Sequence, residues 1–160
     1  MIISSNNLQA LISKCWASTK DGTKKLNEAF HQCIQMKNDF PIYLFFSINK
    51  SSQFCSVAKL LSDSSYQPPS CIKWDSQDKW DGQFKLDWIF VKDIPNKYFK
   101  PLKNKLNDYQ SVVHSRDVQE VSTEEGYEML QFFQNFNQET SILDDFDEII
   151  KIQKKLKLNK

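Results

Sequence analysis

An almost uninterrupted apolar run, Pro-Ile-Tyr-Leu-Phe-Phe-Ser-Ile at residues 41–48, most constrains the fold of this 160-residue chain. The run is short for a helix and rich in strand-forming residues, so it predicts a buried central strand. Residues 54–58 alternate like a second strand, which we expect to pair with the first as a hairpin. These two segments predict the centre of a β-sheet.

A third strand is indicated further along, where apolar residues alternate with mostly charged ones. The apolar positions are Phe84, Leu86, Trp88 and Phe90. This period of two predicts a strand with a single buried face. It also makes Trp88 a core residue.

Helical patterns precede the strands. Residues 5–7 supply capping side chains ahead of an apolar stripe that leads to Trp16 at its end. Asp21 and Gly22 mark a turn, and residues 24–36 follow as a second helix.

Helical patterns also close the chain. Ser122 and Glu125 have the spacing of a capping box, and another helix follows Ser141. Together these elements predict a single α/β domain around a curved mixed sheet. We expect the domain to occupy residues 1–150, followed by a basic tail at 151–160.

Composition limits the class of protein. The chain carries 21 basic and 20 acidic side chains, so any grip on nucleic acid must come from a local basic patch and base contacts. The four cysteines, at 15, 33, 55 and 71, lack the close pairs of a zinc site and are interpreted as buried free thiols. We expect no metal and no cofactor.

Two tryptophans suggest a ligand site. Trp74 and Trp80 bracket five polar residues that offer no apolar face for a strand or a helix. Two indoles on one solvated loop indicate a clamp for a flat molecule such as a nucleobase. The pattern is equally consistent with both rings folding back into the core.

An enzyme is the least favoured class. His31 and His114 have no nucleophile at a recognisable spacing, and three glycines form no phosphate-binding loop. The acidic run at 144–148 is interpreted as the start of a helix, where the dipole favours carboxylates.

Six segments in order resemble one family. They are residues 14–26, 43–49, 76–80, 88–96, 115–121 and 140–146. They resemble the YTH domain, the module that reads N6-methyladenosine in RNA, and the sequence of residues 77–80 and 88–96 is closer to the cytoplasmic branch of this family. The resemblance implies an open, barrel-like curved sheet packed with α-helices.

The resemblance also implies a binding site. A cage for the methylated base falls on Trp16, Trp74 and Trp80. Contacts to the base edge fall on the backbone carbonyl of Ala17, on Asn49, and on Asn7 or Asn6. Contacts to the RNA backbone fall on Arg116 and Asp117, with Lys14, Lys73 and Lys79 on a basic rim.

Simpler roles remain open for some of these residues. Sequence alone favours a surface ion pair between Arg116 and its neighbour, and only the resemblance favours RNA; Asn49 is also consistent with a turn residue after a strand, alone or in both roles. The chain also departs from the family: no Lys precedes Lys14, residues 50–52 lack the glycines that relatives favour, and one residue is inserted between Trp74 and Trp80.

Three functions follow from these observations. The first is a reader of N6-methyladenosine in single-stranded mRNA that regulates mRNA fate. The second is an RNA binder of this fold that reads an unmodified motif, and the third is a methyl-lysine peptide reader. We expect a monomer without membrane attachment, cytoplasmic, with the nucleus as the alternative location.

Overall fold

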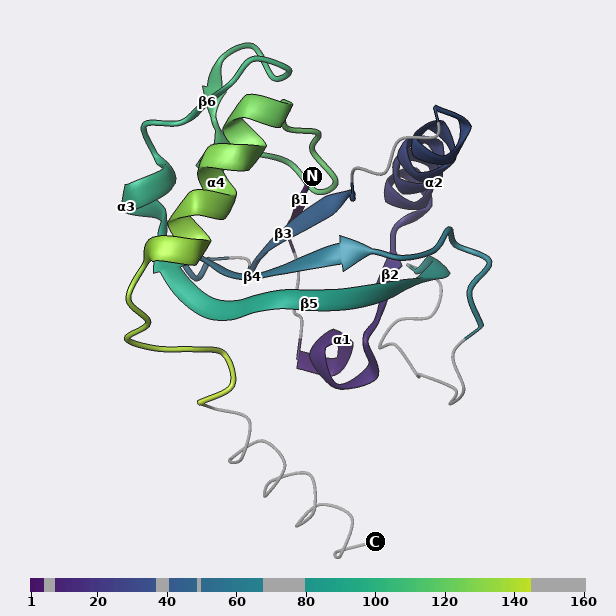
Figure 1. Ribbon diagram of the computed structural model, residues 1–160, viewed down its shortest axis with the longest axis horizontal. Helices are drawn as coiled ribbons and strands as arrows, with labels where there is room; N and C mark the ends of the chain where they lie inside the picture. The colour runs from purple at the N-terminus through teal and green to yellow at the C-terminus, as the bar shows by residue number, and fades with distance from the viewer. Residues whose placement is uncertain (5–7, 37–40, 49, 68–79, 145–160) are drawn as a thin grey trace, which may run out of the picture.

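The computed structural model describes residues 1–4, 8–36, 41–48, 50–67 and 80–144. Its centre is a five-stranded sheet with the order β1-β3-β4-β5-β2. The strands are β1 (Ile2–Ser4), β2 (Cys15–Ser18), β3 (Tyr43–Ser47), β4 (Gln53–Leu60) and β5 (Asp81–Pro95). β1 runs parallel to β3 and the other pairs are antiparallel, so the sheet is mixed. The long strand β5 curves across the whole sheet (Figure 1).

Helices cover both faces of this sheet. They are α1 (Leu8–Ser13), α2 (Lys20–Gln35), α3 (Asn96–Phe99) and α4 (Thr123–Asn135). A short ribbon of β6 (Lys103–Asn104) and β7 (Gln110–Ser111) and a 3₁₀ turn, η2 (Val112–His114), lie between α3 and α4 in sequence. In Figure 1, α3 and α4 lie at one end of the sheet and α2 lies at the other. The expected α/β class with a curved mixed sheet is confirmed.

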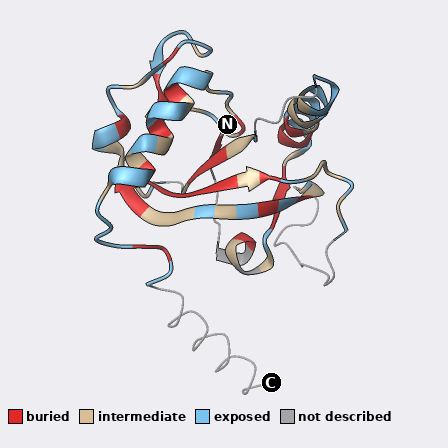
Figure 2. Cartoon of the chain, viewed as in Figure 1, coloured by how far each residue is buried: buried red, intermediate tan, exposed pale blue. Residues whose placement is uncertain are grey.

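The apolar run at 41–48 is explained by burial on both faces of β3. Leu44 and Phe46 belong to a core cluster that includes Ala10 of α1 and Leu26 of α2. Phe45 points the opposite way, into a second cluster with residues of α3 and α4. A strand covered on both sides needs apolar residues at consecutive positions. Figure 2 accordingly shows β3 and β4 mostly buried, whereas β5 alternates between classes.

The predicted single buried face of β5 is wrong beyond Trp88. Ala58 pairs with Trp88 but Val57 pairs with Phe90, so Ile89 is an extra residue on β5. Such a bulge shifts the alternation by one position. Trp88 therefore packs against the first cluster and Phe90 against the second. Trp88 is in the core as expected, although it is only partly buried.

Two boundaries near the N-terminus also differ from the prediction. Lys14 has φ 51°, which ends α1, so Trp16 lies in β2 and not at the end of a helix. Asp21 and Gly22 form no turn before α2 because they lie in its first turn. The Thr19 hydroxyl caps that turn by accepting a hydrogen bond from the amide of Gly22 at 3.2 Å.

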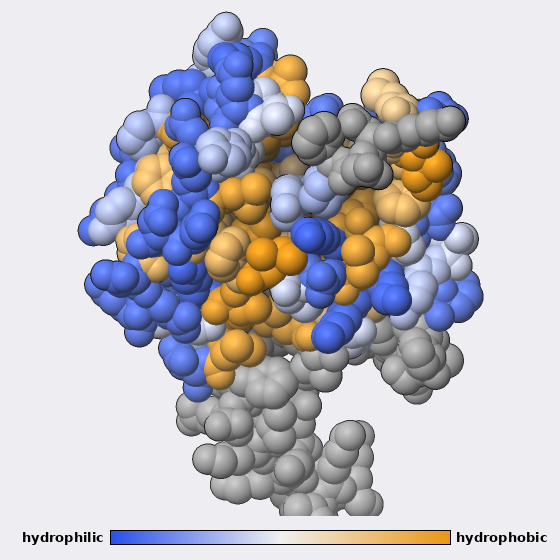
Figure 3. Space-filling model, viewed as in Figure 1, coloured by the Kyte–Doolittle hydropathy of each residue, from blue (hydrophilic) through white to orange (hydrophobic). Residues whose placement is uncertain are grey.

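The C-terminal prediction is met in part. Ser122 is the N-cap residue of α4, but its hydroxyl bonds to the Glu125 carboxylate and not to a backbone amide. After α4 the chain returns along β5, where the Ser141 hydroxyl donates to the carbonyl of Val91 at 3.0 Å. Residues 142–144, the start of the predicted last helix, form a turn, and residues 145–160, which include the rest of that prediction and the proposed boundary at 150, lie outside the described residues. Figure 3 shows hydrophobic side chains gathered in the middle of one face, between α4 and α2.

Candidate functional site

Two of the three expected cage tryptophans lie next to each other. Trp16 is on β2, opposite Phe84 of β5, and Trp80 directly precedes β5. Their ring centroids are 5.9 Å apart with an interplanar angle of 68°. This edge-to-face geometry is one of the two that aromatic pairs prefer. The two indoles thus meet where the paired strands β2 and β5 bring them together.

A row of two further aromatic rings packs against Trp16. Phe46 of β3 lies 5.6 Å from Trp16 at 80°, and Trp88 of β5 lies 4.9 Å from Phe46. The indole N–H of Trp88 also donates to the carbonyl of Ala10 at 3.4 Å, which links this row to α1. We did not expect Phe46 or Trp88 to support the site. The alternation of their strands was the available signal, since it places both side chains on the same face of the sheet.

Trp16 is more deeply buried than a pocket wall. It is 1% exposed and is among the largest fully buried side chains, whereas Trp80 is partly exposed. Trp16 is thus a core residue, unlike a side chain that lines an open pocket. Because its ring is covered in this structure, a base can stack on Trp16 only after neighbouring groups move.

Ala17 lies at an irregularity of the sheet. Trp16 pairs with Phe84 but Ser18 pairs with Asp81, so β5 carries an extra residue opposite Ala17. Bulges of this kind locally disrupt the ladder of backbone hydrogen bonds and are frequent beside functional sites. Ala17 itself is buried, directly after Trp16.

Lys14 begins the same stretch of chain. Its side chain is exposed, and its carbonyl accepts a hydrogen bond from the amide of Leu86 at 2.9 Å. A left-handed conformation at a residue other than glycine costs about 1–2 kcal/mol. The bond to β5 helps to offset this cost and fixes the backbone two residues before Trp16.

Arg116 and Asp117 lie in a turn that packs against the first core cluster. Arg116 is exposed, and no salt bridge joins it to another residue within the described parts of the chain. Val118, directly after Asp117, adopts φ 49°. Its side chain is 1% exposed and belongs to the cluster that contains Trp16. The carbonyl of Gln119 accepts a hydrogen bond from the amide of Ile2 at 2.9 Å, and the amide of Gln119 donates to the carbonyl of Ile2 at 3.2 Å. The turn is therefore anchored on its C-terminal side while the guanidinium of Arg116 reaches solvent.

The turn that follows β3 is closed without glycine. Lys50 and Ser52 have φ values of 67° and 58°, the region that favours glycine. The Ser51 hydroxyl donates to the carbonyl of Ile48 at 2.7 Å and accepts from the amide of Gln53 at 3.3 Å. These bonds stabilise the strained turn. Its remaining residue, Asn49, is outside the described residues.

Half of the expected site residues lie outside the described parts of the chain. They are Asn6, Asn7, Asn49, Lys73, Trp74 and Lys79. The structure therefore brings together Trp16, Trp80 and Ala17 and places Lys14 and Arg116 at the surface.

The described cysteines form no disulfide with one another. Cys15 and Cys55 are buried, whereas Cys33 is only partly buried, and Cys71 is outside the described residues. Burial raises the pKa of the Cys15 thiol to about 11, and the thiol lies 3.3 Å from the side-chain oxygen of Gln83. Among the described residues, no group of three or more His, Cys, Asp or Glu side chains is placed to hold a metal ion. None of the described helices is long and apolar enough to span a bilayer.

Comparison with known proteins identifies relatives of this chain. A family model described as the YT521-B-like domain, YTH, matches residues 2–134. YTH domain-containing protein ECT4 of Arabidopsis thaliana is 40% identical over 131 residues, which is 82% of this chain and 21% of the relative. YTH domain-containing family protein 1 of Mus musculus is 41% identical over 138 residues, 86% of this chain and 24% of the relative. The chain thus spans less than a quarter of the length of either relative.

Solved structures agree with the sequence comparison. The Pho92 YTH domain, solved in complex with m6A, has a TM-score of 0.79 and 31% identity, and covers 89% of this chain and 87% of its own. The YTH domain of Zygosaccharomyces rouxii MRB1, in complex with N6-methyladenosine RNA, has a TM-score of 0.71 and 30% identity over 89% of this chain and 88% of its own. This chain belongs to the YTH domain family.

Proposed function

We propose that this chain binds single-stranded RNA and recognises N6-methyladenosine without catalysing a reaction. The observation that carries the proposal is the pair of indoles, Trp16 and Trp80, held 5.9 Å apart beside the bulge at Ala17. Two YTH domains of the same fold, at 30% and 31% identity, were solved with N6-methyladenosine ligands. Trp74 would complete the cage.

Stacking supplies most of the affinity in this proposal. A base stacked on an aromatic side chain gains roughly 1–3 kcal/mol. Burial of the additional methyl group contributes only about 0.8 kcal/mol. Stronger preference for the methylated base therefore requires a penalty on the unmethylated one, whose second amine N–H would lose water against an indole.

Polar groups around the cage would read the base edge and the RNA backbone. The carbonyl of Ala17 would accept from the remaining amine N–H, while Asn49 and either Asn6 or Asn7 would contact the ring nitrogens. Arg116 would bind a phosphate, since its exposed guanidinium is free of described salt bridges. Asp117 would hold the geometry of that turn, and Lys14 would extend the basic surface with Lys73 and Lys79.

The wider role follows from the same proposal. We infer an RNA-binding module over residues 1–150 with a basic tail at 151–160, acting as a cytoplasmic regulator of mRNA. The 41% identity to YTH domain-containing family protein 1 over 138 residues supports the module. The module itself would need no cofactor.

Calorimetric titration tests the proposal directly. One short single-stranded RNA is prepared with and without a single N6-methyl group and titrated at fixed salt. A preference of tenfold or more, about 1.4 kcal/mol, is expected for the methylated strand. Equal affinities would contradict methyl recognition and indicate a binder of unmodified RNA, and binding to neither strand would reject both.

A further inference from the structure

Backbone contacts join the residues before Trp74 to the residues after Trp80, on the two sides of the segment that carries both tryptophans. Before the segment, Ser64 lies beside the start of β5, where its carbonyl accepts from the amide of Gln83 at 3.2 Å. Ser65 and Gln83 also form an isolated bridge. The residues on either side of the segment therefore meet each other directly.

Gly82 permits this close approach. An added Cβ at Gly82 would lie 2.5 Å from the Cβ of Ser64, and the residue has φ 66°. Both the space and the backbone conformation therefore require glycine. A side chain here would push Ser64 away from β5.

Helix α2 holds the same junction from a third side. Asn27 makes two hydrogen bonds to Ser64: its amide group donates to the hydroxyl at 2.8 Å, and its oxygen accepts from the backbone amide at 2.9 Å. One turn earlier, the Thr23 hydroxyl donates to the carbonyl of Asp81 at 2.5 Å. Asp81 is the residue directly after Trp80, so α2 contacts both ends of the tryptophan segment.

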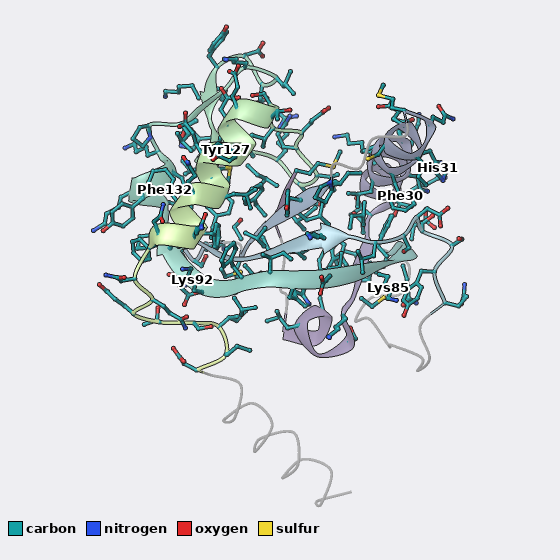
Figure 4. The ribbon with its side chains drawn as sticks, in the orientation of Figure 1. Phe30, His31, Lys85, Lys92, Tyr127 and Phe132 are labelled. Atoms are coloured by element: carbon teal, nitrogen blue, oxygen red, sulfur yellow. The ribbon has the colours of Figure 1, made fainter. Side chains whose placement is uncertain are left out.

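A weaker contact reinforces this junction at the surface. His31 of α2 lies 3.1 Å from Asp63, which also accepts from the amide of Ser65 at 3.0 Å. The hydrogen bonds from Ser65, together with His31, hold the pKa of Asp63 below its ordinary value. Figure 4 shows His31 on α2 at the same end of the sheet as Lys85 of β5.

We propose that Asn27 and Thr23 are positioning residues for the base-binding site, because they hold Trp80 at its place beside Trp16. This inference rests on the proposed function. Neither side chain would touch the base: they act through Ser64 and Asp81. By fixing Ser64 and Asp81 relative to α2 they hold the backbone next to Trp80 before RNA binds, and preorganisation of this kind raises affinity.

The junction borders water, which limits the expected effect. Thr23, Asn27, Ser64 and Asp81 line an open surface pocket of about 430 Å³. Thr23 is 5% exposed, whereas Asn27 and Ser64 are half-buried. Since a hydrogen bond that competes with water has a modest net value, we expect loss of the Asn27 pair to weaken binding roughly 3- to 30-fold.

The test replaces Asn27 and compares RNA binding with local protection. Asn27→Leu removes both bonds while keeping a good helix former, and Gln32→Leu makes a matched change at an exposed position of α2. We expect Asn27→Leu to lower affinity for the methylated RNA 3- to 30-fold and to reduce the ratio of methylated to unmethylated affinity. Hydrogen exchange of the Ser64 and Gln83 amides should become faster. Gln32→Leu should change none of these values.

Two further variants separate positioning from folding. Asn27→Asp keeps acceptors for the Ser64 amide and hydroxyl, so it should recover most of the affinity. Thr23→Val removes the bond to Asp81 at nearly constant volume and should also lower the methyl preference, even if Asn27→Leu proves too unstable to measure.

The outcomes distinguish this inference from the proposed function. Unchanged affinity and methyl preference in Asn27→Leu, together with faster exchange at Ser64, would overturn the inference alone. A wild-type protein without methyl preference would instead reject the proposed function, and the inference with it. Equal losses in Asn27→Leu and Gln32→Leu would indicate a general effect of altering α2 and would also overturn it.

Discussion

The contrast between Trp16 and Trp80 yields the sharpest prediction. Both belong to the proposed cage, but Trp16 is 1% exposed and Trp80 is partly exposed. Trp16→Ala removes a buried large aromatic side chain, which costs about 3–5 kcal/mol. For a domain of this size, the midpoint of thermal unfolding should fall by about 6–20 °C.

Trp80→Ala should be milder for stability. It loses the edge-to-face contact with Trp16, worth about 0.5–1.5 kcal/mol, and part of the burial of one indole. We expect a total of about 1–2.5 kcal/mol and a fall of about 2–10 °C. Binding should nevertheless suffer strongly, because one stacked base is worth roughly 1–3 kcal/mol, or roughly 5- to 150-fold in affinity.

Thermal unfolding and titration with methylated RNA, measured on the same protein samples, test both statements. Trp16→Phe is the matched control: it keeps an aromatic ring against Phe46, so it should recover much of the stability lost in Trp16→Ala. If Trp16→Ala unfolds at the wild-type temperature, the packing argument is refuted. If Trp80→Ala is as unstable as Trp16→Ala and still binds RNA normally, Trp80 is a core residue and not part of a cage.

Four other measurements probe the surface, the thiols and the backbone. Arg116→Ala should weaken RNA binding without changing methyl preference. It should also reduce the slope of log affinity against log salt concentration by about 0.7, the value for one single-strand phosphate, and an unchanged slope would remove Arg116 from the interface. Because the pKa of Cys15 is raised from 9.0 to about 11, the unfolded chain loses its thiol proton first, so stability should fall as pH rises through this window, and less so in Cys15→Ala. At pH 8 iodoacetamide should modify partly buried Cys33 before Cys15, and the reverse order would contradict the burial. Gly22→Ala places a Cβ 2.2 Å from a hydroxyl oxygen and should destabilise by about 1–3 kcal/mol, whereas Gly126→Ala, with nothing within 4 Å, should stabilise α4 by about 0.5–1 kcal/mol; similar melting temperatures would disprove the contrast.

Local patterns in the sequence determined the main elements of the sheet. The apolar run at 41–48 and the alternation after residue 81 are properties of neighbouring residues, and both became strands. The adjacency of Trp16 and Trp80 was implied only through the resemblance to a family, since 63 residues separate the two positions in the chain.

Tertiary structure decided which face each side chain occupies. The bulge at Ile89 turns Phe90 away from the face that holds Trp88, and the alternation gave no sign of it. A bulge depends on how one strand pairs with a distant one, so its position is set by the register of the whole sheet.

Burial of Trp16 and the junction at Asn27 are likewise products of packing. Trp16 is covered because β2, β3 and β5 converge on it, and no pattern within residues 15–18 distinguishes a covered indole from an exposed one. The contact between Asn27 and Ser64 joins residues 37 positions apart. The sequence alone therefore determined the three central strands and most of the helices, but not β1 and β2. Contacts between distant segments decided how the indoles are held, because burial and hydrogen-bond pairing depend on neighbours that only the folded chain brings together.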